Sequence, residues 1–260
     1  MSDIPTRSQP RAFDVRFSDI GTVLTLLSRL PIPRSWHNPD RITQSPWAYP
    51  LAGALIGALA GIGAWAFLGL GVPAGPAAAL GLIVMALLTG VLHEDGLADC
   101  ADGLWGGSTT ARRLEIMRDS RIGAYGTVAL ILSILVRWSL LSELVADAPV
   151  AAFVVVATVS RVPMALAQAL MTQARIDGLA ARVGRPLMGT ALIALALGTA
   201  LALIAYGWSG VIVMAAALIG PIPLLITAQT KIGGITGDIL GGTQQLAEIA
   251  ALIALVAVLT

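Results

Sequence analysis

Seven long apolar stretches constrain the fold of this chain more than any other feature of its sequence. They cover about residues 50–72, 76–93, 124–146, 149–170, 187–206, 208–228 and 240–260. Each is close to the roughly 20 residues that a helix needs to cross the core of a bilayer. Because 57% of the residues are hydrophobic and only 12% are charged, a soluble fold is excluded. We therefore predict an all-α, polytopic membrane helix bundle with about seven transmembrane helices.

Basic residues occur in alternate connections between these stretches. All but two of the 16 Lys and Arg residues lie in segments 1–49, 94–123, 171–186 and 229–239, and the short connections near 73–75, 147–148 and 207 have none. The positive-inside rule then predicts a cytoplasmic N-terminus, cytoplasmic long loops and a C-terminus on the other side. The third and seventh stretches contain polar residues, and the sixth contains two prolines. A total of six or eight spans is therefore also possible.

Two local patterns refine this organisation. Ile20, Val23, Leu24, Leu27 and Leu30 recur at helical spacing over a segment too short to span, which favours an interfacial helix on the cytoplasmic leaflet. Glycines at 53, 57 and 61 form a ridge of small residues that predicts close helix packing. We predict one domain over residues 1–260: a cytoplasmic segment, 1–49, and a transmembrane bundle, 50–260, with an active-site loop over 93–123.

Four of the 15 acidic residues lie within nine positions, at Glu94, Asp95, Asp99 and Asp102, and we call this the acidic motif. If the preceding helix continues through them at about 100° per residue, the three aspartates share one narrow face. Stacked carboxylates repel one another unless a cation lies among them, and hard oxygen ligands select Mg²⁺ or Mn²⁺ over Zn²⁺. A metal-bound diphosphate is the ligand that such a motif typically holds.

Other candidate residues surround this motif in the sequence. Arg118, Asp119 and Arg121 follow it in R-D-S-R, and guanidinium groups bind phosphate oxygens bidentately. Arg137, Arg161 and Glu248 interrupt apolar stretches, where a charge is costly unless it is paired or functional. We interpret Arg161 as a phosphate ligand, and Arg137 as a partner of Glu143 or a residue near the membrane edge.

Three further residues complete the candidate site. Lys231 and Asp238 flank a glycine-rich loop whose residues do not follow the order of a P-loop, so a Walker ATPase is rejected. We predict that Lys231 contacts phosphate and that Asp238 is a fifth carboxylate of the site. His93, directly before the acidic motif, is a candidate base or a hydrogen-bond partner of one of its carboxylates. Glycines 123 and 126, which follow R-D-S-R, would allow the backbone to approach a ligand.

The runs H-E-D-G-L-A-D-C-A-D-G-L-W-G-G at 93–107 and I-M-R-D-S-R-I-G-A-Y-G at 116–126 resemble the cobalamin synthases, which are adenosylcobinamide-GDP ribazoletransferases. Further matching stretches at 27–33, 49–57, 160–161 and 233–241 extend the resemblance over the whole chain. The resemblance implies a Mg²⁺-dependent transferase of the bacterial inner membrane. Its partners would be adenosylcobinamide-GDP, α-ribazole or α-ribazole 5′-phosphate, and the lipid bilayer, with no nucleic acid.

In this hypothesis each candidate has a role. The catalytic residues are Asp95, Asp99, Asp102 and His93; the phosphate-binding residues are Arg118, Arg121, Arg161, Lys231 and Asp119; the metal ligands are Glu94, Asp95, Asp99, Asp102 and Asp238. The base preference, the number of metal ions, the general base, the oligomeric state and a partner from the same pathway stay open.

Two other classes use similar residues. An intramembrane prenyl- or CDP-alcohol-type phosphotransferase would also combine carboxylates, Mg²⁺ and a diphosphate. The second aspartate-rich motif that a prenyltransferase needs is missing around Asp238, and the CDP-alcohol pattern has Arg where this chain has Asp99. A divalent-cation transporter would place its ligands near the midplane, often in repeated halves, and no repeat of the acidic motif is present.

Overall fold

The computed structural model describes residues 14–259, and every regular element in that range is a helix. The helices are α1 (Phe17–Leu27), α2 (Tyr49–Gly69), α3 (Ala74–Thr89), α4 (Leu92–Gly106), α5 (Thr110–Ile116), α6 (Ala124–Leu144), α7 (Pro149–Val159), α8 (Val162–Leu170), α9 (Leu179–Val183), α10 (Met188–Tyr206), α11 (Trp208–Ile219), α12 (Ile222–Ile232) and α13 (Gly237–Leu259). Three short 3₁₀ helices, η1 (Arg34–Trp36), η2 (Pro39–Arg41) and η3 (Ser45–Ala48), lie between α1 and α2. The all-α prediction is therefore confirmed.

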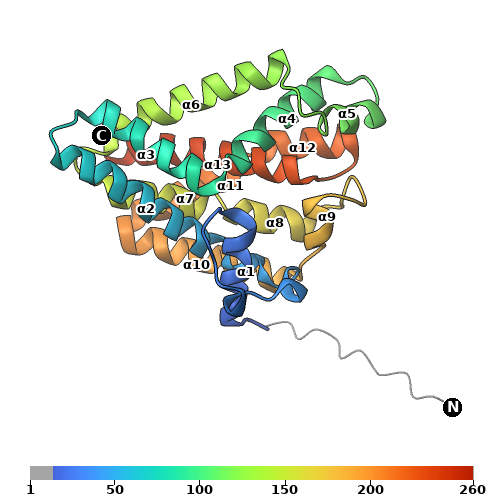
Figure 1. Cartoon of the computed structure of the whole chain (residues 1–260), viewed down its shortest axis with the longest axis horizontal. Helices are drawn as coiled ribbons and strands as arrows, with labels where there is room; N and C mark the ends of the chain where they lie inside the picture. Colours follow the sequence, from blue (N-terminus) through green and yellow to red (C-terminus); the bar gives the residue numbers. More distant parts are fainter. Residues whose placement is uncertain (1–13, 260) are drawn as a thin grey trace.

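Six segments of the described chain are long and apolar enough to cross a membrane, or seven if the bent pair α3 and α4 forms one span. They are Ser45–Gly69, Ala124–Leu144, Pro149–Leu170, Met188–Tyr206, Trp208–Ile232 and Gly237–Leu259. The predicted polytopic helix bundle is thus confirmed. Figure 1 shows α4, α5 and α9 at one end of the bundle and the C-terminal end of α13 at the other.

Prolines explain why two of these spans, Pro149–Leu170 and Trp208–Ile232, consist of two α-helices. Pro163 is at the start of α8 and Pro223 at the start of α12, directly after short interruptions of the helical backbone. Proline lacks a backbone N–H and its ring clashes with the preceding turn, so it interrupts a helix but suits a helix start. The interruption before α8 places Arg161 at the N-cap of that helix.

The predicted glycine ridge packs α2 against α7. A Cβ atom on Gly53 would lie 2.2 Å from the carbonyl oxygen of Ala157, and one on Gly57 would lie 2.4 Å from that of Phe153. A Cβ on Gly61 would lie 2.6 Å from the Cα of Val150. Only glycine permits this approach, so the prediction of close helix packing is confirmed.

The predicted N-terminal helix exists as α1, but its apolar face packs against protein. Val23 and Leu27 are buried in the core cluster that includes Trp47 and Ala48 of η3. We expected this face to lie on the leaflet, and periodicity alone could not tell lipid from protein as its partner. The first part of the predicted cytoplasmic segment, with Arg7 and Arg11, lies outside the described residues.

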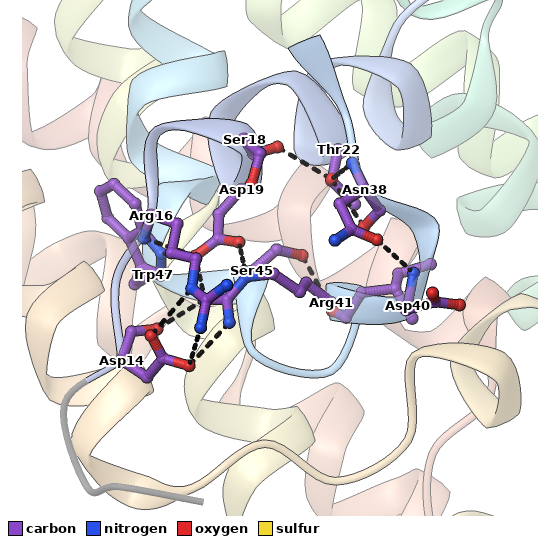
Figure 2. A network of polar contacts seen from close by, with 11 residues as sticks. Asp14, Arg16, Ser18, Asp19, Thr22, Asn38, Asp40, Arg41, Ser45 and Trp47 are labelled. Atoms are coloured by element: carbon purple, nitrogen blue, oxygen red, sulfur yellow. Dashed lines mark hydrogen bonds and ion pairs between the residues drawn. The ribbon is translucent and has the colours of Figure 1, made fainter. Parts of the chain in front are cut away.

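A polar network fixes α1 to the segment that leads into α2 (Figure 2). The guanidinium of Arg41 lies between Asp14 and Asp19, with Nη1 2.7 Å from Oδ2 of Asp14 and Nε 2.7 Å from Oδ1 of Asp19. The indole N–H of Trp47 also donates to Asp19, over 2.9 Å. Burial raises the pKa of Asp19, but these bonds and one from the Arg16 backbone outweigh it and the net pKa lies below 3.8.

The helix does not continue into the acidic motif as expected, because it breaks between α3 and α4 with a bend of 87°. Gly90 ends α3 in the left-handed conformation, with φ of 63°. Val91 follows with φ of 54°, the only described residue other than glycine with positive φ. A β-branched residue in this region is strained, so contacts beyond the break must hold it.

Candidate active site

A cleft of about 770 Å³ brings together the two motifs that the sequence placed apart. We call it the α3–α6 cleft and define the arginine loop as residues 117–122. The acidic motif contributes Glu94, Asp95 and Asp99 to its lining, and the arginine loop contributes Arg118 and Arg121. Its remaining walls are largely apolar and include Leu82, Ile83, Ile134 and Trp138 of α3 and α6. The cleft therefore combines a charged end with an apolar end.

Asp95 and Asp99 are the two carboxylates that this cleft leaves without partners. They lie four residues apart on α4, which places them on the same face of the helix. No residue between 14 and 259 donates a hydrogen bond to either side chain. Asp238, Asp95 and Asp102 all repel a charge on Asp99. Such a pair favours a bound cation.

Asp238 approaches this pair because α4 and α13 cross at glycines. A Cβ on Gly96 would lie 2.8 Å from the carbonyl oxygen of Asp238 and 3.0 Å from the Cα of Gly241. The Asp238 carboxylate is itself bonded, at 3.1 Å to Nη2 of Arg175 and 3.1 Å to the hydroxyl of Thr236. Asp238 contributes charge near Asp99, and its Oδ2 is held by Arg175 and Thr236.

Asp102, the third predicted metal ligand on the aspartate face, is buried and used as a helix cap. Its Oδ2 accepts the backbone N–H of Gly123 over 2.7 Å and its Oδ1 accepts that of Gly126 over 3.0 Å. A Cβ on either glycine would lie 2.4 Å from a carboxylate oxygen of Asp102. The glycines after R-D-S-R thus allow the backbone to approach Asp102, where we expected a ligand.

The two arginines of the arginine loop are exposed and paired with carboxylates. Arg118 donates to Asp177, and Nη2 of Arg121 lies 2.8 Å from Oδ2 of Asp119. These bonds from Arg121 lower the pKa of Asp119 to about 2. Solvent-exposed ion pairs contribute little to stability because water screens them, so a phosphate can replace either carboxylate. Asp119 therefore orients Arg121 and, as an anion, is not itself a phosphate ligand.

Glu94 and Arg137 form an ion pair at the cleft wall, with Nη1 of Arg137 3.1 Å from Oε1 of Glu94. Arg137 also lies 2.9 Å from Glu248 of α13, so the expected pairing with Glu143 was wrong. The sequence showed these charges but not their partners. Equal numbers of acids and bases within apolar stretches were the signal that could have suggested the pairing.

Besides Asp102 and Asp238, three predicted site residues lie away from the cleft lining. His93 is 2% exposed and Arg161 is fully buried, with Nη1 donating to the Ala157 carbonyl over 2.7 Å. Lys231 donates to the Leu104 carbonyl over 2.8 Å, and its ammonium lies 4.7 Å from the Trp105 ring centroid. The structure does not bring these three side chains to Asp95 and Asp99, because each is held by helix packing or by backbone acceptors.

Whether a metal ion fits this cleft depends on Asp95 and Asp99, the two carboxylates without partners in the described chain. Between residues 14 and 259, no group of three or more His, Cys, Asp or Glu side chains is arranged to hold a metal ion. Mg²⁺ commonly takes one or two carboxylates and completes its shell with water and substrate phosphates. Asp95 and Asp99 fit that mode. Asp102 does not, because both of its oxygens are bonded, and Glu94 and Asp238 each have one oxygen held by other groups.

Fold and site together define a multi-pass membrane protein with a cleft suited to a phosphorylated ligand. A family model described as cobalamin-5-phosphate synthase matches residues 19–256. The chain belongs to this family. The predicted resemblance is confirmed, and so is the prediction of a transferase of phosphorus-containing groups in cobalamin biosynthesis.

Curated relatives agree over nearly the whole chain. An adenosylcobinamide-GDP ribazoletransferase of Mesorhizobium japonicum is 43% identical over 242 residues, covering 90% of this chain and 91% of the relative. Those of Azorhizobium caulinodans and Brucella ovis are 43% and 38% identical, each over 90% of this chain and over 93% and 94% of the relative. No solved structure matches the chain.

Proposed function

We propose that this protein transfers α-ribazole, or its 5′-phosphate, onto adenosylcobinamide-GDP and releases GMP at the bacterial cytoplasmic membrane. The observation that carries the proposal is the meeting of Asp95 and Asp99 with Arg118 and Arg121 in one cleft. Carboxylates beside arginines suit a diphosphate that binds together with a divalent cation. The names of the relatives support the substrates.

The reaction would proceed by displacement at phosphorus. The 3′ oxygen of ribazole forms a bond to the phosphorus on the cobinamide side, and the bond from that phosphorus to the bridging oxygen breaks. GMP leaves with the bridging oxygen, and the hydroxyl proton passes to a base. Because the lining of the cleft includes aspartates but not His93, we assign the proton acceptor to a carboxylate there.

Asp95 and Asp99 would hold Mg²⁺ on the diphosphate, where a cation neutralises charge and orients the phosphates. Arg118 and Arg121 would exchange their carboxylate partners for phosphate oxygens and stabilise the charge that develops on GMP. The apolar walls from α3 and α6 would exclude water from the reacting phosphorus. Asp95, Asp99, Arg118 and Arg121 all line the cleft in the structure as it stands.

The test is release of GMP by purified protein supplied with adenosylcobinamide-GDP, α-ribazole and Mg²⁺. The proposal predicts GMP in amounts equal to the corrinoid product and no release without the ribazole. Release of pyrophosphate from a prenyl diphosphate, or of CMP from a CDP-alcohol, would instead support the other phosphotransferase classes.

A further inference from the structure

Four charged side chains from different segments lie near one another inside the bundle behind the cleft, although the described residues show no ion pair between Arg161 and the other three. Arg137 of α6 and Glu248 of α13 are 2% and 0% exposed, and Arg161, at the start of α8, is also fully buried. Glu94 of α4 completes the group, and its side chain retains 14% exposure toward the cleft. We call these residues the buried charge cluster. Both Glu248 and Glu94 attract the charge on Arg161.

The contacts of Arg137 tie Glu94 to two other helices. Arg137 Nη1 lies 3.1 Å from Oε1 of Glu94, and its Nε lies 2.9 Å from Oε1 of Glu248. The same Nη1 donates to the side-chain oxygen of Gln245 over 2.6 Å. The amide of Gln245 in turn donates to Oε1 of Glu94 over 3.3 Å. One oxygen of Glu94 is therefore held by α6 and α13 together.

The cluster is balanced in charge, with two arginines against two glutamates. A buried charge that loses its partner is strongly destabilising, whereas an intact or completely removed pair is tolerated far better. Oε1 of Glu94 is committed to this balance, while Oε2 is buried without a hydrogen-bond partner in the described chain. If Oε1 turned to a cation in the cleft, the buried guanidinium of Arg137 would lose one of its two carboxylates.

Because of its position in the chain, Glu94 links its contacts with Arg137 and Gln245 to the geometry of the site. It lies three residues after Val91, whose left-handed backbone is strained, and directly before Asp95. Strained conformations persist only where surrounding contacts determine them. The bonds of Glu94 hold the first turn of α4 at the place where such contacts are needed, and the direction of that turn sets where Asp95 and Asp99 point.

We propose that Glu94 is a positioning residue and not a cation ligand: with Arg137 and Gln245 it fixes the start of α4 so that Asp95 and Asp99 face the cleft. The inference rests on the proposed function for the role of those two aspartates. It differs from the sequence-based hypothesis, in which Glu94 was one of five metal ligands.

The experiment uses four variants, each purified in detergent: Glu94→Gln, Arg137→Gln, the double variant that combines these two changes, and Asp95→Asn. Asp95→Asn serves as the reference for the loss of a cation ligand. Glu143→Gln on α6, an exposed carboxylate outside the cluster, is the matched control. Binding of Mn²⁺ is measured by electron paramagnetic resonance without substrate. Thermal melting and the kcat and KM for GMP release are measured on the same samples.

For Glu94→Gln we expect a kcat at least tenfold lower and a Kd for Mn²⁺ raised about three- to fivefold, because Asp95 and Asp99 are displaced but still present. Asp95→Asn should raise that Kd at least tenfold. In the double variant, the losses in melting temperature and in kcat should be smaller than the sum of the losses in the two single variants. The reason is that the charges of Glu94 and Arg137 are removed together, so neither is left unpaired by the other's loss. Glu143→Gln should match wild type in every readout.

An increase in the Kd for Mn²⁺ in Glu94→Gln as large as that in Asp95→Asn would make Glu94 a ligand and overturn the proposal. Strictly additive losses in melting temperature and kcat would overturn it as well. The Mn²⁺ and melting measurements need no turnover. If wild type releases no GMP but these two readouts follow the expectation, the proposed function fails while the assignment of Glu94 stands.

Discussion

Asp102 accepts the backbone N–H of Gly126 over 3.0 Å and so caps a helix that begins more than twenty residues later in the chain. The contact joins α4, which carries the acidic motif, to α6, which forms the opposite wall of the cleft. A buried carboxylate that bonds two N–H groups at a helix start also opposes the positive end of the helix dipole. Asp102 therefore shapes the cleft without lining it.

Replacing Asp102 with Asn should lower thermal stability as well as activity. The change removes a charge and one acceptor, and each hydrogen bond to a charged group contributes about 1.5–3 kcal/mol. The melting temperature of the purified variant should fall by several degrees. Asp99→Asn, on the same helix but without hydrogen-bonding partners in the described chain, should melt near wild type. Equal melting of Asp102→Asn and wild type would contradict the capping role.

Arg118→Ala and Arg121→Ala should each reduce kcat/KM by roughly 10- to 150-fold, the equivalent of about 1.5–3 kcal/mol for a lost charge-assisted bond. The lysine variants should recover only part, since an ammonium cannot reproduce the bidentate fork. Steady-state GMP release measures this loss. Arg112→Ala, outside the cleft lining and paired with Glu115, is the control, and a loss of equal size there would indicate a general effect of charge.

The Asp19 network should make stability depend on pH only in acid. Its net pKa is below the ordinary value of 3.8, so its contribution is fully present above that value and is lost as the pH falls through the folded pKa. The melting temperature of wild type should therefore drop more steeply than that of Asp19→Asn as the pH falls below 3.8. Parallel curves for the two proteins would remove Asp19 as the cause.

Reporter fusions should locate the site end of the bundle. Fusions after residues 110 and 180 should be cytoplasmic, because the loops around them carry arginines. A reporter at the C-terminus should be periplasmic. A cytoplasmic C-terminus would mean an even number of spans and would require α3 and α4 to form a re-entrant segment.

The sequence was sufficient to predict those features that depend on local composition. Apolar length identified the spans, and the spacing of Gly53 and Gly57 predicted close packing, although not that α7 is the partner. The bend before the acidic motif was missed because residues 76–93 are apolar apart from Thr89 and His93. Gly90, directly before Val91, was the available signal, but a glycine alone does not specify an 87° bend.

The division of roles among the acidic residues could not be predicted for a different reason. Glu94, Asp95 and Asp102 are alike in the sequence, and their roles are set by groups that arrive from distant segments. Arg137 forms an ion pair with Glu94, and a backbone N–H at the start of α6 donates to Asp102. The carboxylates left for a cation are those without such partners, which only the packing of α4 against α6 and α13 reveals.

The central claim, that Asp95 and Asp99 hold a divalent cation on the diphosphate, is tested most directly by GMP release measured against Mg²⁺ concentration for wild type, Asp95→Asn and Asp99→Asn. We predict that wild-type release depends on Mg²⁺, and that neither variant reaches one hundredth of wild-type turnover at any Mg²⁺ concentration while both insert into the membrane normally. Wild-type turnover in both variants, or wild-type release that is unchanged after removal of all divalent cations, would contradict the account.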